Sequence, residues 1–173
     1  AWGEKRDSQF NLADPNQFHA AYHAVCAELL VADQLKRRSL MSELSEQLQP
    51  TVIPPRLTMT WDDVRTLLAR HLCFKIGGHT KEHTDLTGVP AEQAKKELDD
   101  CIQRIKDETG VQAQYFSFCY GRTSEELRRL ASSAGFKAAC GGDGLDPVIK
   151  DTTDLFRLPR IEGPASMLRF ALL

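Results

Sequence analysis

The sequence contains no long hydrophobic run and no marked excess of charge. No segment approaches the roughly 20 consecutive apolar residues that a membrane-spanning helix requires. Among 173 residues, 22 Lys and Arg nearly balance 24 Asp and Glu, for a formal net charge of -2. We therefore expect neither a membrane span nor a nucleic-acid partner. The first residues also lack an initiator Met and the apolar stretch of a signal peptide, as a cleaved or truncated N-terminus would.

Closely spaced cysteine pairs are missing too. The cysteines are odd in number and widely spaced, and no C-x-x-C pair occurs. This pattern argues against a disulfide framework and against a cysteine-based structural zinc site. We interpret them as mostly buried thiols, which favours a reducing compartment. They are Cys26, Cys73, Cys101, Cys119 and Cys140.

The first fifty residues carry a helical pattern. Asp14 is suited to cap a helix because Pro15 follows it at the first helical position. A second apolar stripe ends at Pro50, and the prolines at 54–55 exclude further helix. We predict a helical hairpin over residues 14–49, as an accessory insertion within one domain of residues 1–173. The apolar residues at helical spacing are Phe18, Ala21, Tyr22, Val25 and Leu29, then Leu40, Leu44 and Leu48.

The remaining residues alternate between predicted helices and short strands. Helices are expected from about residue 60, from about residue 90 to Gly110, and from a capping box at residues 123–126. Strands are expected at residues 73–76, 115–118 and 136–140. This alternation predicts parallel pairing in an α/β layered or barrel fold.

Ligands in such folds bind where strands end and loops begin. Two glycines follow the first predicted strand and would let the backbone turn sharply into His79 and His83. On a helical turn this spacing places both imidazoles on one side, where they can share a metal ion. His19 and His23 have the same spacing but lie within a long predicted helix, so we interpret them as surface residues.

A second loop follows the predicted strand at residues 115–118. Its residues Cys119 to Arg122 include Gly121, which favours a tight turn that can present backbone N–H groups to a developing oxyanion. We interpret Cys119 itself as a buried thiol rather than a nucleophile.

A series of motifs resembles the polysaccharide deacetylase (NodB-like) family over about residues 56–173. Their order and spacing carry the resemblance, since each motif alone is short. The matching segments are 59–64, 76–87, 96–110, 116–122, 134–139 and 158–161.

The resemblance implies an incomplete or distorted (β/α) barrel with fewer than eight strands. It implies hydrolysis of acetyl groups on a polysaccharide or oligosaccharide, assisted by a divalent metal that is usually Zn²⁺. By the same resemblance, His79 and His83 bind the metal and the Tyr120 backbone N–H faces the oxyanion. Thr80 supports the turn between the histidines. The other supporting positions are Gly78, Gly121 and Arg160.

The chain departs from the family pattern in its catalytic groups. The T-F-D-D-G motif that supplies the base and the third ligand is absent, and helix capping explains the similar sequence at residues 60–63. Cys119 replaces the proline before Tyr120, and the late L-x-H motif is missing. We expect a fragment or a degenerate member that hydrolyses acetylated amino sugars barely or not at all. A version extended upstream through an Asp-Asp motif is expected to be active.

Two alternatives stay open. One is a catalytically inactive deacetylase-like domain with a binding role. The other is a zinc peptidase of the inverted H-x-x-E-H type with Glu82 as base, which the glycines before His79 disfavour. The sequence leaves open the sugar, the oligomeric state, and a bacterial cytoplasmic or cell-envelope location.

Overall fold

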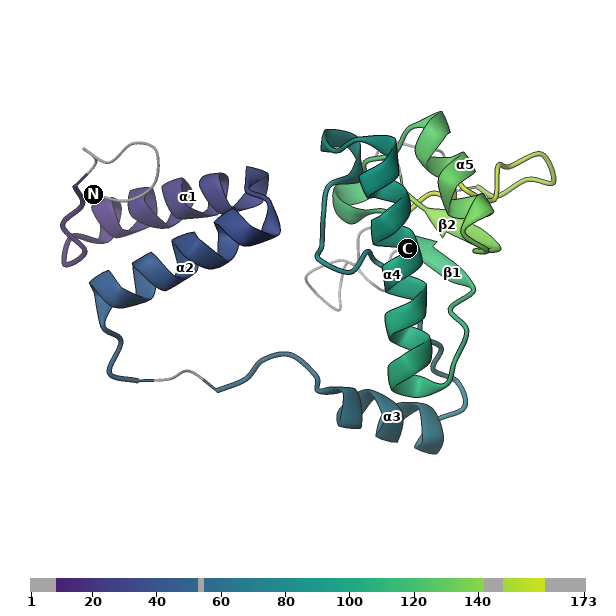
Figure 1. The fold of residues 1–173 in the computed structure, drawn as a ribbon, viewed down its shortest axis with the longest axis horizontal. Helices are drawn as coiled ribbons and strands as arrows, with labels where there is room; N and C mark the ends of the chain where they lie inside the picture. Colours follow the sequence, from purple (N-terminus) through teal and green to yellow (C-terminus); the bar gives the residue numbers. More distant parts are fainter. Residues whose placement is uncertain (1–8, 53–54, 142–147, 161–173) are drawn as a thin grey trace. The chain divides into compact units, whose positions relative to one another are not determined.

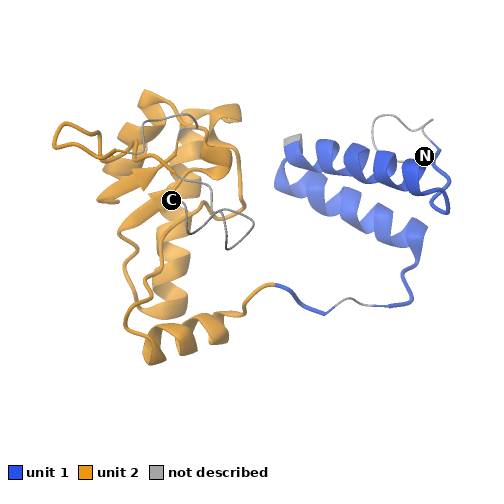
Figure 2. Ribbon diagram, turned by 180° about the vertical axis from the view of Figure 1, so that it is seen from behind, with its two compact units in different colours: residues 1–57 blue, residues 58–173 orange. Residues whose placement is uncertain are grey.

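The computed structural model describes residues 9–52, 55–141 and 148–160. The chain divides into two compact units, Ala1–Leu57 and Thr58–Leu173 (Figure 2). None of the helices in these described residues is long and apolar enough to cross a membrane.

The first unit holds two helices, α1 (Pro15–Val31) and α2 (Gln34–Leu48), which confirms that this segment is a helical hairpin. The Asp14 carboxylate caps α1 by accepting from backbone N–H groups of its first turn, as predicted. Arg37 donates from α2 to the carbonyl oxygens of Leu29 and Ala32 and so ties the two helices together. The predicted apolar stripe of α1 is only partly buried: Ala21, Val25 and Leu29 are half-buried, whereas Phe18 and Tyr22 keep 50% and 57% of their surface.

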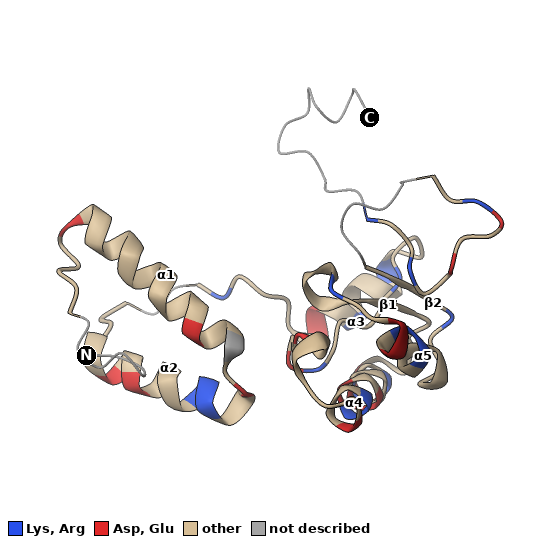
Figure 3. Cartoon of the chain, turned by 90° about the horizontal axis from the view of Figure 1, so that it is seen from above, with Lys and Arg blue, Asp and Glu red and all other residues tan. Residues whose placement is uncertain are grey.

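The second unit contains the helices α3 (Trp61–Arg70), α4 (Ala91–Thr109) and α5 (Glu125–Ser133), the strands β1 (Tyr115–Ser117) and β2 (Ala138–Cys140), and the short 3-10 helices η1 (Leu86–Gly88) and η2 (Cys119–Gly121) (Figure 1). α4 carries both Lys or Arg and Asp or Glu (Figure 3), and Lys95 pairs with Asp99 and Lys96 with Asp100. No single sign of charge therefore dominates this helix.

β1 and β2 pair in parallel, which confirms the α/β class. Parallel bridges continue the ladder on both sides, from Gly78 to Phe116 and from Cys140 to Leu158. The predicted strand at residues 73–76 is wrong. Phe74 closes a turn onto the His71 carbonyl, so the chain joins the ladder only at Gly78. With two strands among the described residues, a barrel stays a prediction.

The core of this unit lies between α4, α5 and the ladder. The apolar residues of α4 form a buried stripe, and Gly110 ends the helix as predicted, in the left-handed region with φ of 70°. Phe118 and Leu98 are fully buried at its centre. The buried members of α4 are Ala94, Leu98, Cys101, Ile102 and Ile105.

Two helix starts test the capping predictions. The Thr60 hydroxyl and the Asp63 carboxylate form the expected reciprocal capping box of α3. The capping box predicted at residues 123–126 is wrong. Ser124, not Thr123, caps α5 by accepting from the Leu127 N–H. A capping box also needs an acidic or amide side chain at the position of Leu127, which would accept from the Ser124 N–H.

Candidate metal centre

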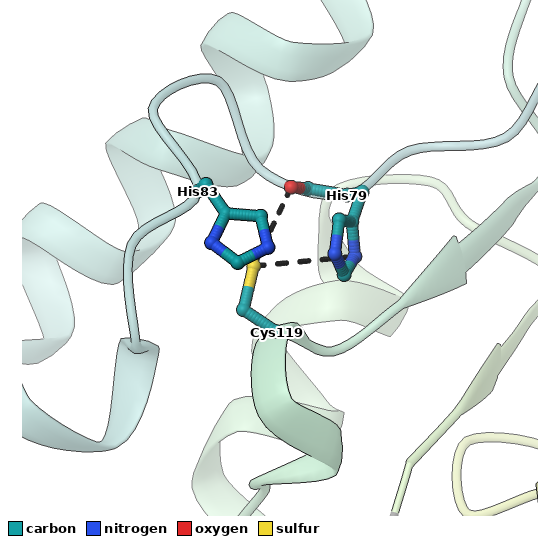
Figure 4. Close-up of side chains that lie close together, drawn as sticks. All are labelled: His79, His83 and Cys119. Carbon is teal, nitrogen blue, oxygen red and sulfur yellow. Dashed lines mark hydrogen bonds between the residues drawn. The ribbon is translucent and has the colours of Figure 1, made fainter. Parts of the chain in front are cut away.

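Three potential metal ligands lie together in the second unit: His79, His83 and Cys119 (Figure 4). One nitrogen of each imidazole and the Cys119 Sγ all lie within 4.8 Å of one another. The two ring centroids are 4.9 Å apart. Among the described residues this is the only group of three or more such ligands, and it contains no carboxylate.

The parallel ladder explains why these residues meet. The Gly78 N–H donates to the Tyr115 carbonyl at 2.8 Å, and the Ser117 N–H donates to the Gly78 carbonyl at 2.9 Å. The chain then leaves the ladder at His79 on one segment and at Cys119 just beyond β1 on the next. Because neighbouring parallel segments end at the same edge, their first loop residues lie side by side.

The glycines before His79 serve close packing. Gly78 lies within the parallel ladder and neither glycine has a positive φ, so the sharp turn predicted at these residues is wrong. A Cβ on Gly78 would lie 2.9 Å from the Phe136 ring and 3.0 Å from the Phe116 ring. A Cβ on Gly77 would lie 2.9 Å from the Tyr115 carbonyl oxygen. Only glycine lets the segment approach β1 this closely.

The segment from His79 to His83 is a loop, not the helical turn that the spacing suggested. Thr80 and His83 adopt positive φ values of 58° and 57°. The Thr84 N–H donates to the buried Thr80 hydroxyl at 3.1 Å and closes the loop. Through this bond Thr80 can support the turn between the histidines, the role that the family resemblance implies. The helix that the zinc-peptidase interpretation needs is missing here.

Two acidic residues of α4 hold this loop, and sequence reasoning missed both. Glu97 Oε2 accepts from the backbone N–H groups of Lys81 and Glu82 at 3.0 and 3.1 Å. The Asp100 carboxylate binds the Lys81 ammonium at 3.0 Å. The only signal in the sequence was their position beside the buried stripe of α4, where a charged residue usually faces solvent.

Ser117 orients His79. Nδ1 of His79 lies 2.7 Å from the Ser117 carbonyl oxygen. The Ser117 hydroxyl accepts from the Arg160 guanidinium at 3.1 Å. Arg160, which the sequence placed among the supporting residues, thus contacts the residue that holds His79 rather than the histidines themselves.

Tyr120 contacts His83. Nδ1 of His83 lies 3.2 Å from the Tyr120 hydroxyl, and the two rings meet edge to face with centroids 5.0 Å apart. The Arg122 guanidinium lies 5.9 Å from the centre of the Tyr120 ring and binds the Asp85 carboxylate at 2.7 Å. Burial alone would raise the pKa of Asp85, but hydrogen bonds from Thr87 and Arg122 outweigh it and lower that pKa.

The turn after β1 has the left-handed backbone expected of a tight turn. φ is 56° at Tyr120 and 67° at Gly121. The Gly121 N–H donates to the Phe118 carbonyl and the Arg122 N–H to the Cys119 carbonyl. Neither bond uses the N–H of Tyr120, which the family resemblance assigns to the oxyanion.

Cys119 is buried, with 2% of its surface exposed. Its thiol donates to the His79 carbonyl oxygen at 3.5 Å, and its Sγ lies 3.4 Å from the Thr80 hydroxyl. Burial raises the pKa of the thiol, and the contact with Thr80 opposes that rise. The prediction of mostly buried cysteines is wrong for two positions, since Cys26 and Cys73 are exposed.

The aspartates at the start of α3 lie outside this ligand group. Asp63 accepts from the backbone N–H and the hydroxyl of Thr60. Asp62 pairs with Arg65 at 2.6 Å. Both carboxylates are thus engaged at their own helix.

Comparison with solved structures shows a shared fold. The chain is similar to the deacetylase PplD of Streptococcus pyogenes in complex with acetate, with 15% identity and a TM-score of 0.55 over 60% of this chain and 44% of that one. It is also similar to a polysaccharide deacetylase of Bacillus cereus, with 13% identity and a TM-score of 0.53 over 73% of this chain and 43% of that one. The chain is similar as well to the BpsB deacetylase domain of Bordetella bronchiseptica, with 16% identity and a TM-score of 0.51 over 64% of this chain and 52% of that one.

This chain therefore spans less than half the length of the first two of these structures. Among curated proteins, no sequence matches it. The family model described as polysaccharide deacetylase matches residues 34–139. Because that match covers more than half of the 173 residues, the chain belongs to the polysaccharide deacetylase family.

Proposed function

We propose that this chain takes part in removing N- or O-acetyl groups from a polysaccharide, with His79 and His83 as ligands of a divalent metal ion. The observation that supports this most directly is the convergence of the two imidazoles at the edge where the parallel segments end. Family membership supplies the substrate class, an acetylated polysaccharide or oligosaccharide.

The residues present suit a metal ion such as Zn²⁺. In both histidines Nδ1 contacts a neighbour, the Ser117 carbonyl in one and the Tyr120 hydroxyl in the other. Such contacts fix the ring orientation and leave Nε2 as the ligand atom. Imidazole is a preferred ligand of zinc. The chemistry expected of a divalent ion here is polarisation of an acetyl carbonyl and activation of a water molecule.

Two groups of the chain have defined tasks in this proposal. The Tyr120 N–H, which the bonds of its own turn leave unused, donates to the oxyanion that forms from the acetyl carbonyl. The Tyr120 hydroxyl holds the His83 ring through Nδ1. One residue thus connects the oxyanion site with the metal site.

A non-catalytic binding role is the second candidate, and one observation favours it. The ligand group contains no carboxylate among the described residues, and acids beside it are engaged. Asp85 is paired with Arg122, and Glu97 holds the loop through two N–H groups. A general base must reach the water that it activates.

Metal content tests the proposed ligands. The wild type, His79→Ala and His83→Ala are loaded with Zn²⁺, desalted and analysed for bound metal. We expect each substitution to remove most of the metal. His19→Ala and His23→Ala are the matched controls, since this pair has the same spacing on α1. Equal metal content in all five proteins would overturn the assignment.

Acetate release separates catalysis from binding. N-acetylglucosamine oligomers are incubated with the 173-residue chain, and with a version extended upstream through an Asp-Asp motif, with and without a chelator. We expect barely detectable release by the former and chelator-sensitive release by the latter. Metal binding without acetate release by either would favour the non-catalytic candidate.

A further inference from the structure

Among the described residues, the Cys119 sulfur is the third atom of the ligand group, and no carboxylate takes part in it. It lies within 4.8 Å of one nitrogen on each imidazole. The Cys119 Sγ lies 4.0 Å from Nδ1 of His79, the nitrogen that faces Ser117, so the sulfur is beside the ring whose Nε2 would bind the ion (Figure 4). Its residue begins η2, directly after the buried Phe118. The sulfur is therefore held in position by the core, close to the two histidines.

We propose that Cys119, as a thiolate, is the third protein ligand of the metal ion bound by His79 and His83. This inference rests on the metal site proposed above. Two imidazoles and one thiolate form a ligand set with a single negative charge, as two imidazoles and a carboxylate would. Three protein ligands leave the fourth position of a tetrahedral ion open, as in catalytic zinc sites.

The ligand atoms must move closer together to hold an ion. Zinc bonds of about 2.0 Å to nitrogen and 2.3 Å to sulfur place tetrahedral ligands about 3.3 to 3.6 Å apart. One nitrogen of each imidazole and the sulfur now lie within 4.8 Å of one another, so they must approach by up to about 1.5 Å. His83 is the side chain that can move, since it is exposed on its loop while Cys119 is buried.

The surroundings of the sulfur suit both of its protonation states. As a thiol, Cys119 donates to the His79 carbonyl oxygen. Thr80 Oγ1 already accepts from the Thr84 N–H, so its own hydrogen can donate to the sulfur of a thiolate. On metal binding the S–H bond breaks, a sulfur lone pair forms the bond to the ion, and the proton passes to the solvent.

A sulfur ligand also affects which metals the site accepts. Thiolate and imidazole favour Zn²⁺ and Co²⁺ over Mg²⁺, Mn²⁺ and Ca²⁺, which prefer oxygen ligands. The site should therefore bind Zn²⁺ and Co²⁺ selectively.

Cobalt spectroscopy tests the sulfur ligand independently of activity. Co²⁺ is titrated into the metal-free chain, and into Cys119→Ser, Cys119→Ala and Cys73→Ser. We expect a thiolate-to-cobalt charge-transfer band in the near ultraviolet for the wild type and for Cys73→Ser, whose exposed cysteine lies outside the ligand group. Both Cys119 variants should lose the band and bind Zn²⁺ at least about tenfold more weakly.

The outcomes separate this inference from the metal site itself. Histidine-dependent Co²⁺ binding without the band, or with a band that survives in Cys119→Ser, overturns the sulfur ligand alone. A chain that binds neither Co²⁺ nor Zn²⁺ overturns both proposals. X-ray absorption of the zinc-loaded wild type needs no variant, and a sulfur neighbour at about 2.3 Å is the expected result.

Discussion

The ring of His79 is held by the backbone of Ser117, since its Nδ1 lies 2.7 Å from the Ser117 carbonyl oxygen. A carbonyl oxygen can only accept, so Nδ1 carries a hydrogen, and in the neutral ring Nε2 is the nitrogen with a free lone pair. The ladder that pairs Ser117 with Gly78 therefore sets both the position and the tautomer of His79.

Replacement of His79 by Asn should separate the hydrogen bond to the Ser117 carbonyl from metal binding. The Asn side-chain N–H₂ can take the place of Nδ1–H, whereas no atom replaces Nε2. We expect His79→Asn to lose the metal as fully as His79→Ala does. The Asn variant should be more stable to unfolding by about 1 kcal/mol, the net value of one hydrogen bond. Urea denaturation of the two metal-free variants measures the difference, and equal midpoints would contradict it.

Removal of the Tyr120 hydroxyl should weaken metal binding without changing the fold. Tyr120→Phe deletes the contact to Nδ1 of His83 and keeps the ring. Loss of such an outer contact typically costs about 10- to 100-fold in metal affinity, and we expect the low end because Tyr120 is partly exposed. Competition with a chromogenic chelator gives the affinity. Tyr115→Phe, at an exposed tyrosine on β1, should leave it unchanged.

A methyl group at Gly78 should disrupt the ladder beside the site. The added Cβ would meet the Phe136 and Phe116 rings at 2.9 and 3.0 Å. Overpacking of this kind costs about 1–3 kcal/mol of unfolding free energy. Gly88→Ala is the control, because nothing lies within 4 Å of a Cβ there. Similar urea midpoints for the two variants would show that the segment can shift away from the rings.

Glu97 should control the mobility of the histidine loop. Glu97→Ala removes the acceptor of the Lys81 and Glu82 N–H groups. We expect both amides to exchange with deuterium at least about tenfold faster, because opening no longer breaks a bond to the carboxylate. Glu92→Ala, in the first turn of the same helix, is the matched control. Unchanged exchange at both amides in Glu97→Ala would show that the Glu97 carboxylate does not restrain this loop.

Asp100 should make a small contribution to stability that depends on pH. Lys96 first, and then Lys81, lower the pKa of Asp100 below its ordinary value of about 3.9. A lowered folded-state pKa stabilises the native state above the unfolded-state pKa, and this contribution is lost as pH falls through the folded-state value. The difference between wild type and Asp100→Asn should be below about 1 kcal/mol at pH 7, since the pairs are partly exposed. Urea unfolding should show it shrinking below about pH 4.

Helices were predictable where a cap and a periodic stripe coincide. Asp14 before Pro15 and Gly110 after the stripe of α4 each mark a boundary that the structure confirms. Strands were less predictable, because a strand exists only with its partner. Residues 73–76, three of them apolar, resemble a strand, yet the ladder begins at Gly78, where the side chain is absent and the backbones can approach.

The histidines of the site were predictable from the sequence, but the residues that hold them in place were not. His79 and His83 were identified from a spacing typical of a helix, although they lie on a loop. Ser117 acts through its backbone carbonyl, which every residue has, so its identity carries no signal. Glu97 contacts the loop across about fifteen positions of sequence, and only the folded chain brings them together. Cys119 was interpreted as an inert buried thiol because its burial was foreseen and its neighbours were not.

Three of the four non-glycine residues with positive φ among the described residues belong to this site: Thr80, His83 and Tyr120. Each stores strain of about 1–3 kcal/mol, and a β-branched threonine lies at the costly end of that range. Glycine at these positions would relieve the strain while deleting the hydroxyl, the imidazole or the phenol. Selection for thermal stability alone should therefore favour replacement of the exposed His83 and Tyr120, and a library screened by heat challenge should become enriched in glycine or asparagine at these two positions. Thr80 should be retained, because its buried hydroxyl closes the loop.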